Sequence, residues 1–232
     1  GVIYSGASAA LDDFATEFGI PVTESQAGKG AIPWDHAWNL GPIGVNGGLA
    51  ANRVARDADV IIAVGTRLGD FVTASKTAFQ NPRARVIGIN VAGLDAHKLN
   101  GLPLIGDAKA TLEALAEVLR GEGTVRDIYE SGKPIQALKK EWEAEVDRLR
   151  SIEGTGGKLS QAQVLGLVNE AAGERDVVIN AAGSMPGDLL KLWRTRDPKG
   201  YHVEYGFSTM GYEIPAGLGV KIWRYGMPWR LT

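Results

Sequence analysis

One short run of residues constrains the fold more than any other feature of the chain. Residues 59–65 read DVIIAVG, with five apolar residues in succession. Such a run is typical of a parallel β-strand that helices cover on both faces, because neither face then needs polar side chains. Residues 85–91 and 102–105 repeat the signal. We therefore predict a parallel sheet in the first half of the chain.

Helical patterns alternate with these strands. Apolar residues recur at helical spacing after Ser8, Asn46 and Asp107, and each of these residues is predicted to cap a helix. Gly19 and Gly121 follow the first and the last pattern and are predicted to end those helices. Strands that alternate with helices require right-handed crossovers. We therefore predict an α/β fold with a doubly wound, Rossmann-like parallel sheet.

The segment between the first two helices is rich in glycine. Residues 20–24 are predicted to form a strand, and residues 27–44 a loop. Gly28-Lys29-Gly30 is not a phosphate-binding P-loop, because the upstream glycine and the following Ser or Thr are missing. The chain also has no GxGxxG, which argues against a conventional NAD site in this region.

Composition narrows the classes of function. The formal net charge is -2, and charges of both signs are interspersed along the chain. We therefore do not expect nucleic acid or a membrane as a partner, and we expect a small-molecule substrate. The chain has no cysteine, which excludes disulfides and thiolate chemistry and is compatible with the cytoplasm. No apolar run approaches the roughly 20 residues of a membrane span. The first residues show no export signal.

A charged and glycine-rich segment divides the chain. We predict one domain over residues 1–121, a connector over 122–157 and the start of a second α/β domain over 158–232. Pro134 is predicted to open a connector helix that packs on a surface. The apolar stripe of that helix consists of Ile135, Leu138, Trp142 and Leu149. Glycines within residues 154–157 mark the boundary.

The second domain is predicted to begin with a helix, a strand and another helix. Ser160 and Gln163 form a capping box ahead of the first helix. Residues 176–180 read as the strand, and residues 181–186 as the turn into the next helix.

That turn is the first candidate site. Gly183 and Ser184 follow a strand and precede a helix, where α/β sheets bind ligands and where free N–H groups and the helix dipole favour a phosphate. Taken alone, the turn is more simply a tight connection that binds nothing. Residues 207–210 form a second loop about one βα unit later, and it also leads into a helix. Two such loops at one sheet edge predict a shared cleft.

The segment 205–221, YGFSTMGYEIPAGLGVK, resembles the opening of the diphosphate-binding domain of thiamine diphosphate (ThDP) enzymes. The resemblance implies an enzyme whose first domain is the family's Rossmann-like central domain. It also implies that Gly183 and Ser184 bind the diphosphate of ThDP, with Met185 close behind.

The same resemblance assigns roles to the later loop. It implies that Ser208 offers its backbone carbonyl to the aminopyrimidine of ThDP, with Thr209 beside it, and that Met210 wedges the cofactor into its bent shape. Bending brings the imino nitrogen of the pyrimidine to the carbon that loses a proton. The alternative for Met210 is an ordinary core methionine.

Further segments are similar to the trihydroxycyclohexanedione hydrolases of inositol catabolism. They are residues 24–36, 64–71, 180–183, 192–194 and 201–206. This resemblance implies a cytoplasmic enzyme that uses ThDP and Mg²⁺ to hydrolyse a carbon–carbon bond of a cyclic dione, as a homodimer or a higher homo-oligomer. Lys29 and His36 are candidates for contact with substrate.

No catalytic or metal-binding residue is assigned. Residues 69–70, 106–107 and 187–188 are Gly-Asp pairs, but none continues as the family's Gly-Asp-Gly metal motif. The resemblance places the activating glutamate before Gly1, and the first strand of the central sheet as well. We therefore expect a fragment that is inactive alone, with residues 222–232 as a disordered or non-native tail or, alternatively, an interaction peptide.

Two other functions stay open. One is a different ThDP reaction, such as that of acetolactate synthase or glyoxylate carboligase. The other is a non-catalytic nucleotide-binding module, because a Rossmann-like sheet does not fix function. In flavin-containing relatives, Arg67 would pair with a nucleotide, but nothing in this sequence requires a flavin.

Overall fold

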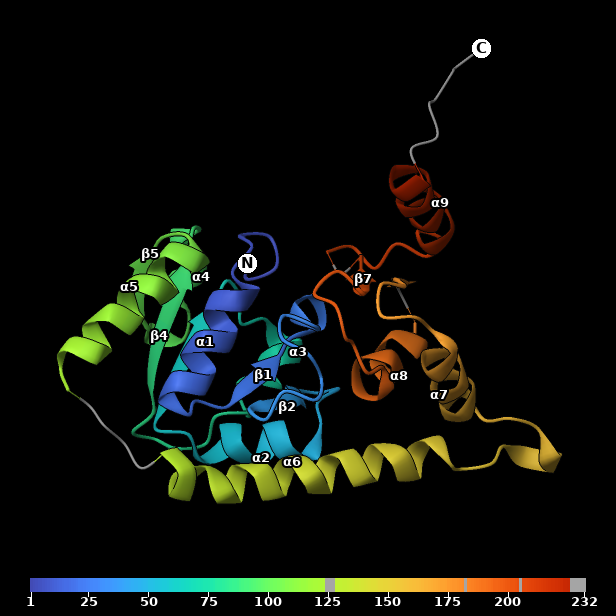
Figure 1. The fold of residues 1–232 in the computed structure, drawn as a ribbon, viewed down its shortest axis with the longest axis horizontal. Helices are drawn as coiled ribbons and strands as arrows, with labels where there is room; N and C mark the ends of the chain where they lie inside the picture. Colours follow the sequence, from blue (N-terminus) through green and yellow to red (C-terminus); the bar gives the residue numbers. More distant parts are fainter. Residues whose placement is uncertain (124–127, 182, 205, 226–232) are drawn as a thin grey trace, which may run out of the picture.

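The computed structural model describes residues 1–123, 128–181, 183–204 and 206–225, and it confirms the predicted α/β fold (Figure 1). In chain order, the elements of the first part are α1 Ser8–Phe18, β1 Val22–Glu24, η1 Gln26–Gly28, β2 Asn39–Pro42, α2 Leu49–Asp57, β3 Val60–Val64, α3 Asp70–Thr73, β4 Arg85–Asn90, α4 Gly93–Ala96, η2 Lys98–Asn100, β5 Leu102–Ile105 and α5 Ala108–Gly121. Those of the second part are α6 Ile128–Arg150, η3 Thr155–Gly157, α7 Gln161–Ala171, β6 Val178–Asn180, α8 Met185–Leu192, β7 Tyr201–Val203 and α9 Glu213–Tyr225.

Every described pair of strands is parallel. β3, β4 and β5 form one sheet in that order, β1 pairs with β2, and β6 pairs with β7. The three strands predicted from the apolar runs are therefore confirmed. On the central strand β4, Ile89 is fully buried, and on β3 Ala63 is 5% exposed. In the described sheet β3 and β5 are edge strands, and Val60 and Leu102 are 47% and 62% exposed.

Helices α1 and α5 cover one side of this sheet. Leu11 and Phe14 of α1 lie in one core with Leu112 of α5, and Ile62 and Val64 of β3 pack against that core. The predicted amphipathic patterns of both helices thus face the sheet, as the 3.6-residue period requires.

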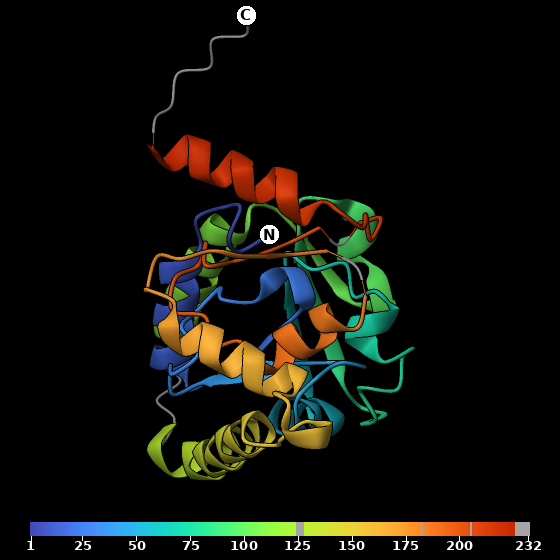
Figure 2. The ribbon, with the colours of Figure 1, turned by 90° about the vertical axis from the view of Figure 1, so that its right-hand side faces the viewer.

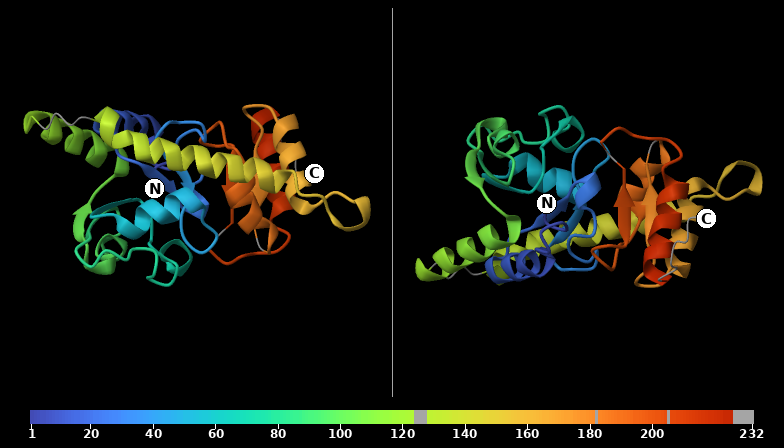
Figure 3. Two further views of the ribbon diagram at one scale, coloured as in Figure 1. Left: turned by 90° about the horizontal axis from the view of Figure 1, so that it is seen from below. Right: turned by 90° about the horizontal axis from the view of Figure 1, so that it is seen from above.

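Helix α6 runs beneath both parts of the molecule (Figures 1 and 3). Trp142 and Val146 of α6 are 6% and 2% exposed, and they share a core with Leu40 of β2, Leu165 of α7 and Leu192 of α8. The prediction of a connector packed on a surface is therefore wrong in one respect. The apolar stripe of α6 is the core between the two parts, because elements from both pack onto it. Figure 2 shows α9 on the side of the molecule opposite to α6.

Pro134 lies inside α6 and does not open it. Proline has no N–H to donate to the carbonyl of residue 130. Helix α6 nevertheless begins at Ile128, more than one turn before Pro134. Gly132 helps to explain this, because a Cβ on Gly132 would lie 2.6 Å from the indole of Trp38. Close packing of Trp38 against the backbone therefore supports the first turns of α6.

Three predicted helix ends are confirmed. The Asp107 side chain accepts the N–H groups of Lys109 and Ala110 at the start of α5. Ser160 and Gln163 form the predicted capping box of α7. Gly19 ends α1 in the left-handed conformation.

Two predicted caps are wrong. Ser8 is the first residue of α1, and the buried Ala7 precedes it without a capping side chain. Helix α2 begins at Leu49, so Gly48 and not Asn46 is its N-cap residue. A Cβ on Gly48 would lie 2.6 Å from the ring of Trp142, so packing against α6 requires glycine at this position.

Two further predictions need correction. Strand β2 lies in the segment predicted to be a loop, and its Gly41 and Pro42 concealed it because both residues are depleted in strands. Helix α9 continues through Trp223 to Tyr225, so the irregular tail does not begin at residue 222. Residues 226–232 lie outside the described part of the chain. Within the described part, no helix has both the length and the hydropathy needed to cross a membrane.

Candidate functional site

The two candidate turns leave the same edge of one small sheet. Asn180 and Val203 are the last residues of β6 and β7, and they stand opposite each other in a parallel pair. The backbone N–H of Glu204 donates to the carbonyl of Asn180 at 3.1 Å, which continues the pairing past the end of β7. Because carboxyl ends of parallel strands meet at one edge, the prediction of neighbouring turns is confirmed.

The first turn has open space around its glycine. Gly183 has φ +107°, and a Cβ on it would meet no atom within 4 Å. Ser184 is the N-cap residue of α8, and its hydroxyl makes no capping bond. Met185, the first residue of α8, is 47% exposed. Of the backbone groups at this helix start, Pro186 has no N–H, and the N–H groups of Gly187 and Asp188 donate to the carbonyl of Ser184, so α8 offers the N–H of Met185. This N–H, the Ser184 hydroxyl and the open space at Gly183 together suit an anion.

One acidic group shares this helix start. Asp188 lies in the first turn of α8, and its carboxylate accepts a hydrogen bond from the side chain of Gln161 at 2.6 Å. This bond holds the negative charge toward α7, which carries Gln161.

The second loop is held by a carboxylate. Glu204 accepts hydrogen bonds from the backbone N–H groups of Phe207 at 2.9 Å and Thr209 at 2.6 Å. Ser208, between them, takes the left-handed conformation with φ +51°. The bonds from the loop, that of Thr209 first, lower the pKa of Glu204. Sequence reasoning missed Glu204, although an acidic residue just before a glycine-containing loop is the available signal.

Met210 is not a core residue in this structure. Its side chain is 86% exposed, and that of Phe207 in the same loop is 92% exposed. Within the described residues, Met210 therefore does not pack in a core. An exposed thioether at this edge is accessible to a ligand.

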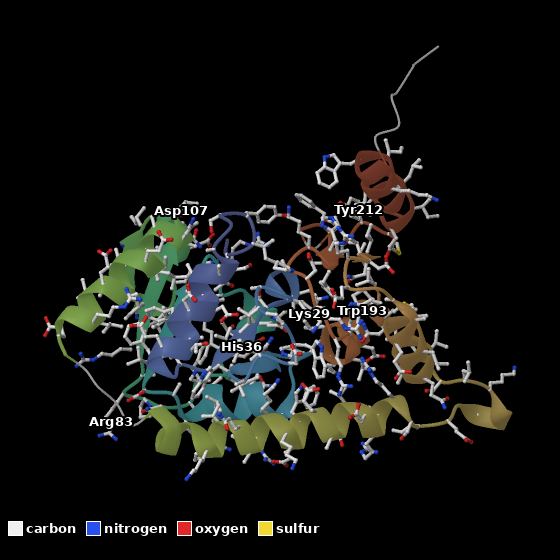
Figure 4. All side chains as sticks on the ribbon, viewed as in Figure 1. Lys29, His36, Arg83, Asp107, Trp193 and Tyr212 are labelled. Atoms are coloured by element: carbon white, nitrogen blue, oxygen red, sulfur yellow. The ribbon has the colours of Figure 1, made fainter. Side chains whose placement is uncertain are left out.

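A second bond fixes the far end of the loop. His202 of β7 and Tyr212, just before α9, are joined by a hydrogen bond of 2.7 Å between Nε2 and the phenol oxygen. Figure 4 shows Tyr212 at the base of α9. The segment that carries Ser208, Thr209 and Met210 is thus tied down at both ends.

Lys29 lies apart from these exposed turns, in the junction between the two parts. Its side chain is 4% exposed, and its ammonium nitrogen is 3.5 Å from a carboxylate oxygen of Glu24. The same nitrogen is 5.9 Å from the ring centroid of Tyr201. Lys29 and Trp193 both line a small pocket, and Figure 4 shows the two residues near each other.

His36 is bonded to α1. Its Nε2 lies 3.2 Å from the Thr16 hydroxyl and 3.3 Å from a carboxylate oxygen of Asp12, and its Nδ1 accepts the N–H of Trp38. The structure thus brings the six residues of the two turns to one edge, and gives Lys29 and His36 separate surroundings. Among the described residues there is no cluster of three or more His, Asp or Glu that could hold a metal.

Comparison with known families shows to which domain the sheet edge with the two candidate turns belongs. Residues 1–115 match the thiamine pyrophosphate enzyme central domain, and residues 181–230 match the thiamine pyrophosphate enzyme C-terminal TPP binding domain. The chain belongs to the thiamine pyrophosphate enzymes. The second match begins at Ala181, the residue after β6. Both candidate turns therefore lie within the TPP binding domain of this family.

Curated relatives extend over nearly the whole chain. Two proteins named 3D-(3,5/4)-trihydroxycyclohexane-1,2-dione hydrolase, from Clostridium perfringens and Clostridium tetani, are 44% identical over 96% of this chain and 38% of their own length. One of the same name from Geobacillus thermodenitrificans is 43% identical over 96% of this chain and 37% of its own length. The chain thus spans about 38% of the length of the curated relatives it matches. The resemblance predicted from the sequence is confirmed.

Proposed function

We propose that the chain is part of a ThDP-dependent hydrolase that cleaves a carbon–carbon bond of trihydroxycyclohexanedione in inositol catabolism. The observation that carries the proposal is the 44% identity over 96% of the chain to relatives of that name. We assign residues 1–121 to the central domain, 122–157 to the connector and 158–232 to the beginning of the cofactor-binding domain. The six residues of the two turns are the proposed cofactor contacts.

Gly183, Ser184 and Met185 are proposed to bind the diphosphate. The left-handed φ of Gly183 and the open space around it allow backbone to approach a phosphate closely. The hydroxyl of Ser184 supplies one more donor beside the backbone N–H of Met185, the first residue of α8. Their part in the reaction is to fix the cofactor in place before substrate binds.

Ser208, Thr209 and Met210 are proposed to bind the organic part of the cofactor. Glu204 engages the N–H groups on both sides of Ser208, so the loop keeps one shape before any ligand arrives. The exposed side chain of Met210 is then available to pack against the cofactor.

Other parts of the enzyme complete the site in this proposal. When bound, ThDP supplies an electron sink for cleavage of a carbon–carbon bond next to a carbonyl. We assign Mg²⁺, its ligands and the activating glutamate to segments outside this chain. We also propose a homodimer or larger homo-oligomer in the cytoplasm, with Lys29 and His36 as secondary candidates for substrate contact.

The test uses the protein encoded by the complete gene. It is assayed with ThDP and Mg²⁺ for opening of the cyclic dione, for acetolactate formation and for carboligation of glyoxylate. We expect ring opening that depends on ThDP, and neither of the other two products. Carboligation without ring opening would assign the chain to another reaction of the family. Binding of NAD or ADP without any ThDP dependence would support the nucleotide-binding module.

A further inference from the structure

A buried glutamine of the first part reaches into the second. Gln26 begins the short helix η1 directly after β1, and only 7% of it is exposed. Its amide nitrogen donates to the carbonyl of Pro186 at 3.1 Å and to the phenol oxygen of Tyr201 at 2.9 Å. These partners lie 160 and 175 positions further along the chain. Burial of a polar side chain costs free energy unless its polar groups form hydrogen bonds. The buried amide of Gln26 therefore requires both Pro186 and Tyr201 as partners.

The chemistry of the partners fixes the direction of these bonds. A backbone carbonyl such as that of Pro186 only accepts, so the amide nitrogen of Gln26 must face it. The second hydrogen of that nitrogen then goes to the oxygen of Tyr201. The hydroxyl hydrogen of Tyr201 remains free to be donated, and the side-chain oxygen of Asn180 lies 3.5 Å away. Burial raises the pKa of Tyr201, which keeps the phenol protonated as a donor.

Asn180 continues the chain of bonds in the same direction. Its side-chain nitrogen donates to the carbonyl of His202 at 3.0 Å, which leaves its side-chain oxygen to accept from Tyr201. Asn180 is 3% exposed and is the last residue of β6. Pro186 is the second residue of α8. One glutamine thus bonds to Pro186 in the first turn of α8 and, through Tyr201, to Asn180 at the end of β6.

We infer that Gln26 is a positioning residue for Gly183, Ser184 and Met185. From the other part of the molecule it binds Pro186 directly, and it reaches Asn180 through Tyr201. The inference rests on the proposed function in so far as this turn binds the diphosphate. Gln26 acts on the turn through its hydrogen bonds to Pro186 and to Tyr201. A residue with only a packing role would lower the stability of the whole protein and leave the turn as ordered as before.

The test compares four forms of the protein encoded by the complete gene. Gln26→Leu removes the amide at similar volume, and Tyr201→Phe removes only the hydroxyl and keeps the buried ring. Gln136→Leu makes the same chemical change on an exposed position of α6 and is the matched control. Hydrogen exchange of the peptide over residues 181–188 is measured without cofactor, with residues 108–121 of α5 as the internal reference. The Kd for ThDP is then measured by calorimetry at saturating Mg²⁺.

For Gln26→Leu we expect exchange of residues 181–188 to be about tenfold faster and the Kd for ThDP about tenfold higher, which is the size of one or two lost buried hydrogen bonds. For Tyr201→Phe we expect changes of about threefold, and for Gln136→Leu none. Wild-type exchange and Kd in a folded Gln26→Leu protein would overturn the inference. If Gln26→Leu does not fold, Tyr201→Phe decides in the same way. A wild-type protein that binds no ThDP would overturn the proposed function, while its exchange rates would still decide whether Gln26 fixes the turn.

Discussion

The two turns of the candidate site are held in different ways. The turn after β6 is held from a distance, because Gln26 bonds to Pro186 across 160 positions of sequence. The loop after β7 is held locally, because Glu204 accepts N–H groups from residues three and five positions further on. A local support forms with its own segment, whereas a distant support exists only once the two parts have packed together. The order of the first turn should therefore depend on the core between the parts, and that of the second loop should not.

The largest expected effect comes from breaking that core. Trp142→Ala removes a 6% exposed indole from the core that both parts share, and we expect a loss of about 3–5 kcal/mol in the free energy of unfolding. Urea denaturation of the chain measures it. The matched control is Trp223→Ala on α9, where the indole is 80% exposed and the change should stay within about 0.5 kcal/mol. Equal losses in the two variants would show that the parts do not depend on this core.

A smaller effect is expected from the first turn itself. Gly183→Ala forces an alanine into φ +107°, which should cost about 1–3 kcal/mol in the free energy of unfolding. Gly69→Ala is the matched control, because φ at Gly69 is -75° and a Cβ there would also meet nothing within 4 Å. Thermal unfolding of both variants separates backbone strain from packing. A Gly183→Ala protein as stable as the wild type would mean that the turn adopts another conformation.

The same contrast explains what the sequence could predict. The apolar strands, the cap at Asp107 and the capping box at Ser160 are local patterns, and all of them were found. The two turns were also found, since strand, glycine and helix follow one another closely in the chain. The role of Gln26 could not be predicted, because no residue near it in the sequence indicates a hydrogen-bond partner 160 positions away.

Packing also decided two helix starts that local rules missed. Helix α2 begins after Gly48, where the ring of Trp142 leaves no room for a side chain. Pro134 lies within α6, although within helices proline is over-represented at the first position. In both cases the deciding residue lies elsewhere in the sequence, so no short pattern contains the information.

A third prediction concerns the far end of the second loop. Tyr212→Phe removes the hydroxyl that bonds to His202 at 2.7 Å, and we expect a loss of about 0.5–1.5 kcal/mol in the free energy of unfolding. Tyr4→Phe, where the residue is 89% exposed, should change it by less than about 0.5 kcal/mol. Denaturation midpoints of the two variants give the comparison. A Tyr212→Phe protein that matches the Tyr4→Phe protein would remove this bond from the account of the loop.

The smallest effect on global stability is expected from loss of the hydrogen bonds that Glu204 accepts within its own loop. The N–H groups of Thr209 and Phe207 favour the ionised form of Glu204 and lower its pKa below the ordinary value of 4.5. The order that Glu204 gives the loop is therefore fully present above the ordinary glutamate range, and it is lost as the pH falls through the lowered pKa. The amide proton shifts of Phe207 and Thr209 should titrate with a midpoint below 4.5, and Glu204→Gln should abolish that titration. A midpoint at or above 4.5 would contradict the local support.

The most direct test of the central claim is an experimental structure of the protein encoded by the complete gene with ThDP and Mg²⁺ bound. We predict diphosphate oxygens about 3 Å from donors of Gly183, Ser184 or Met185, and the side chain of Met210 against the thiazolium ring. Cofactor density at another edge of the molecule, with these turns facing solvent, would contradict the account.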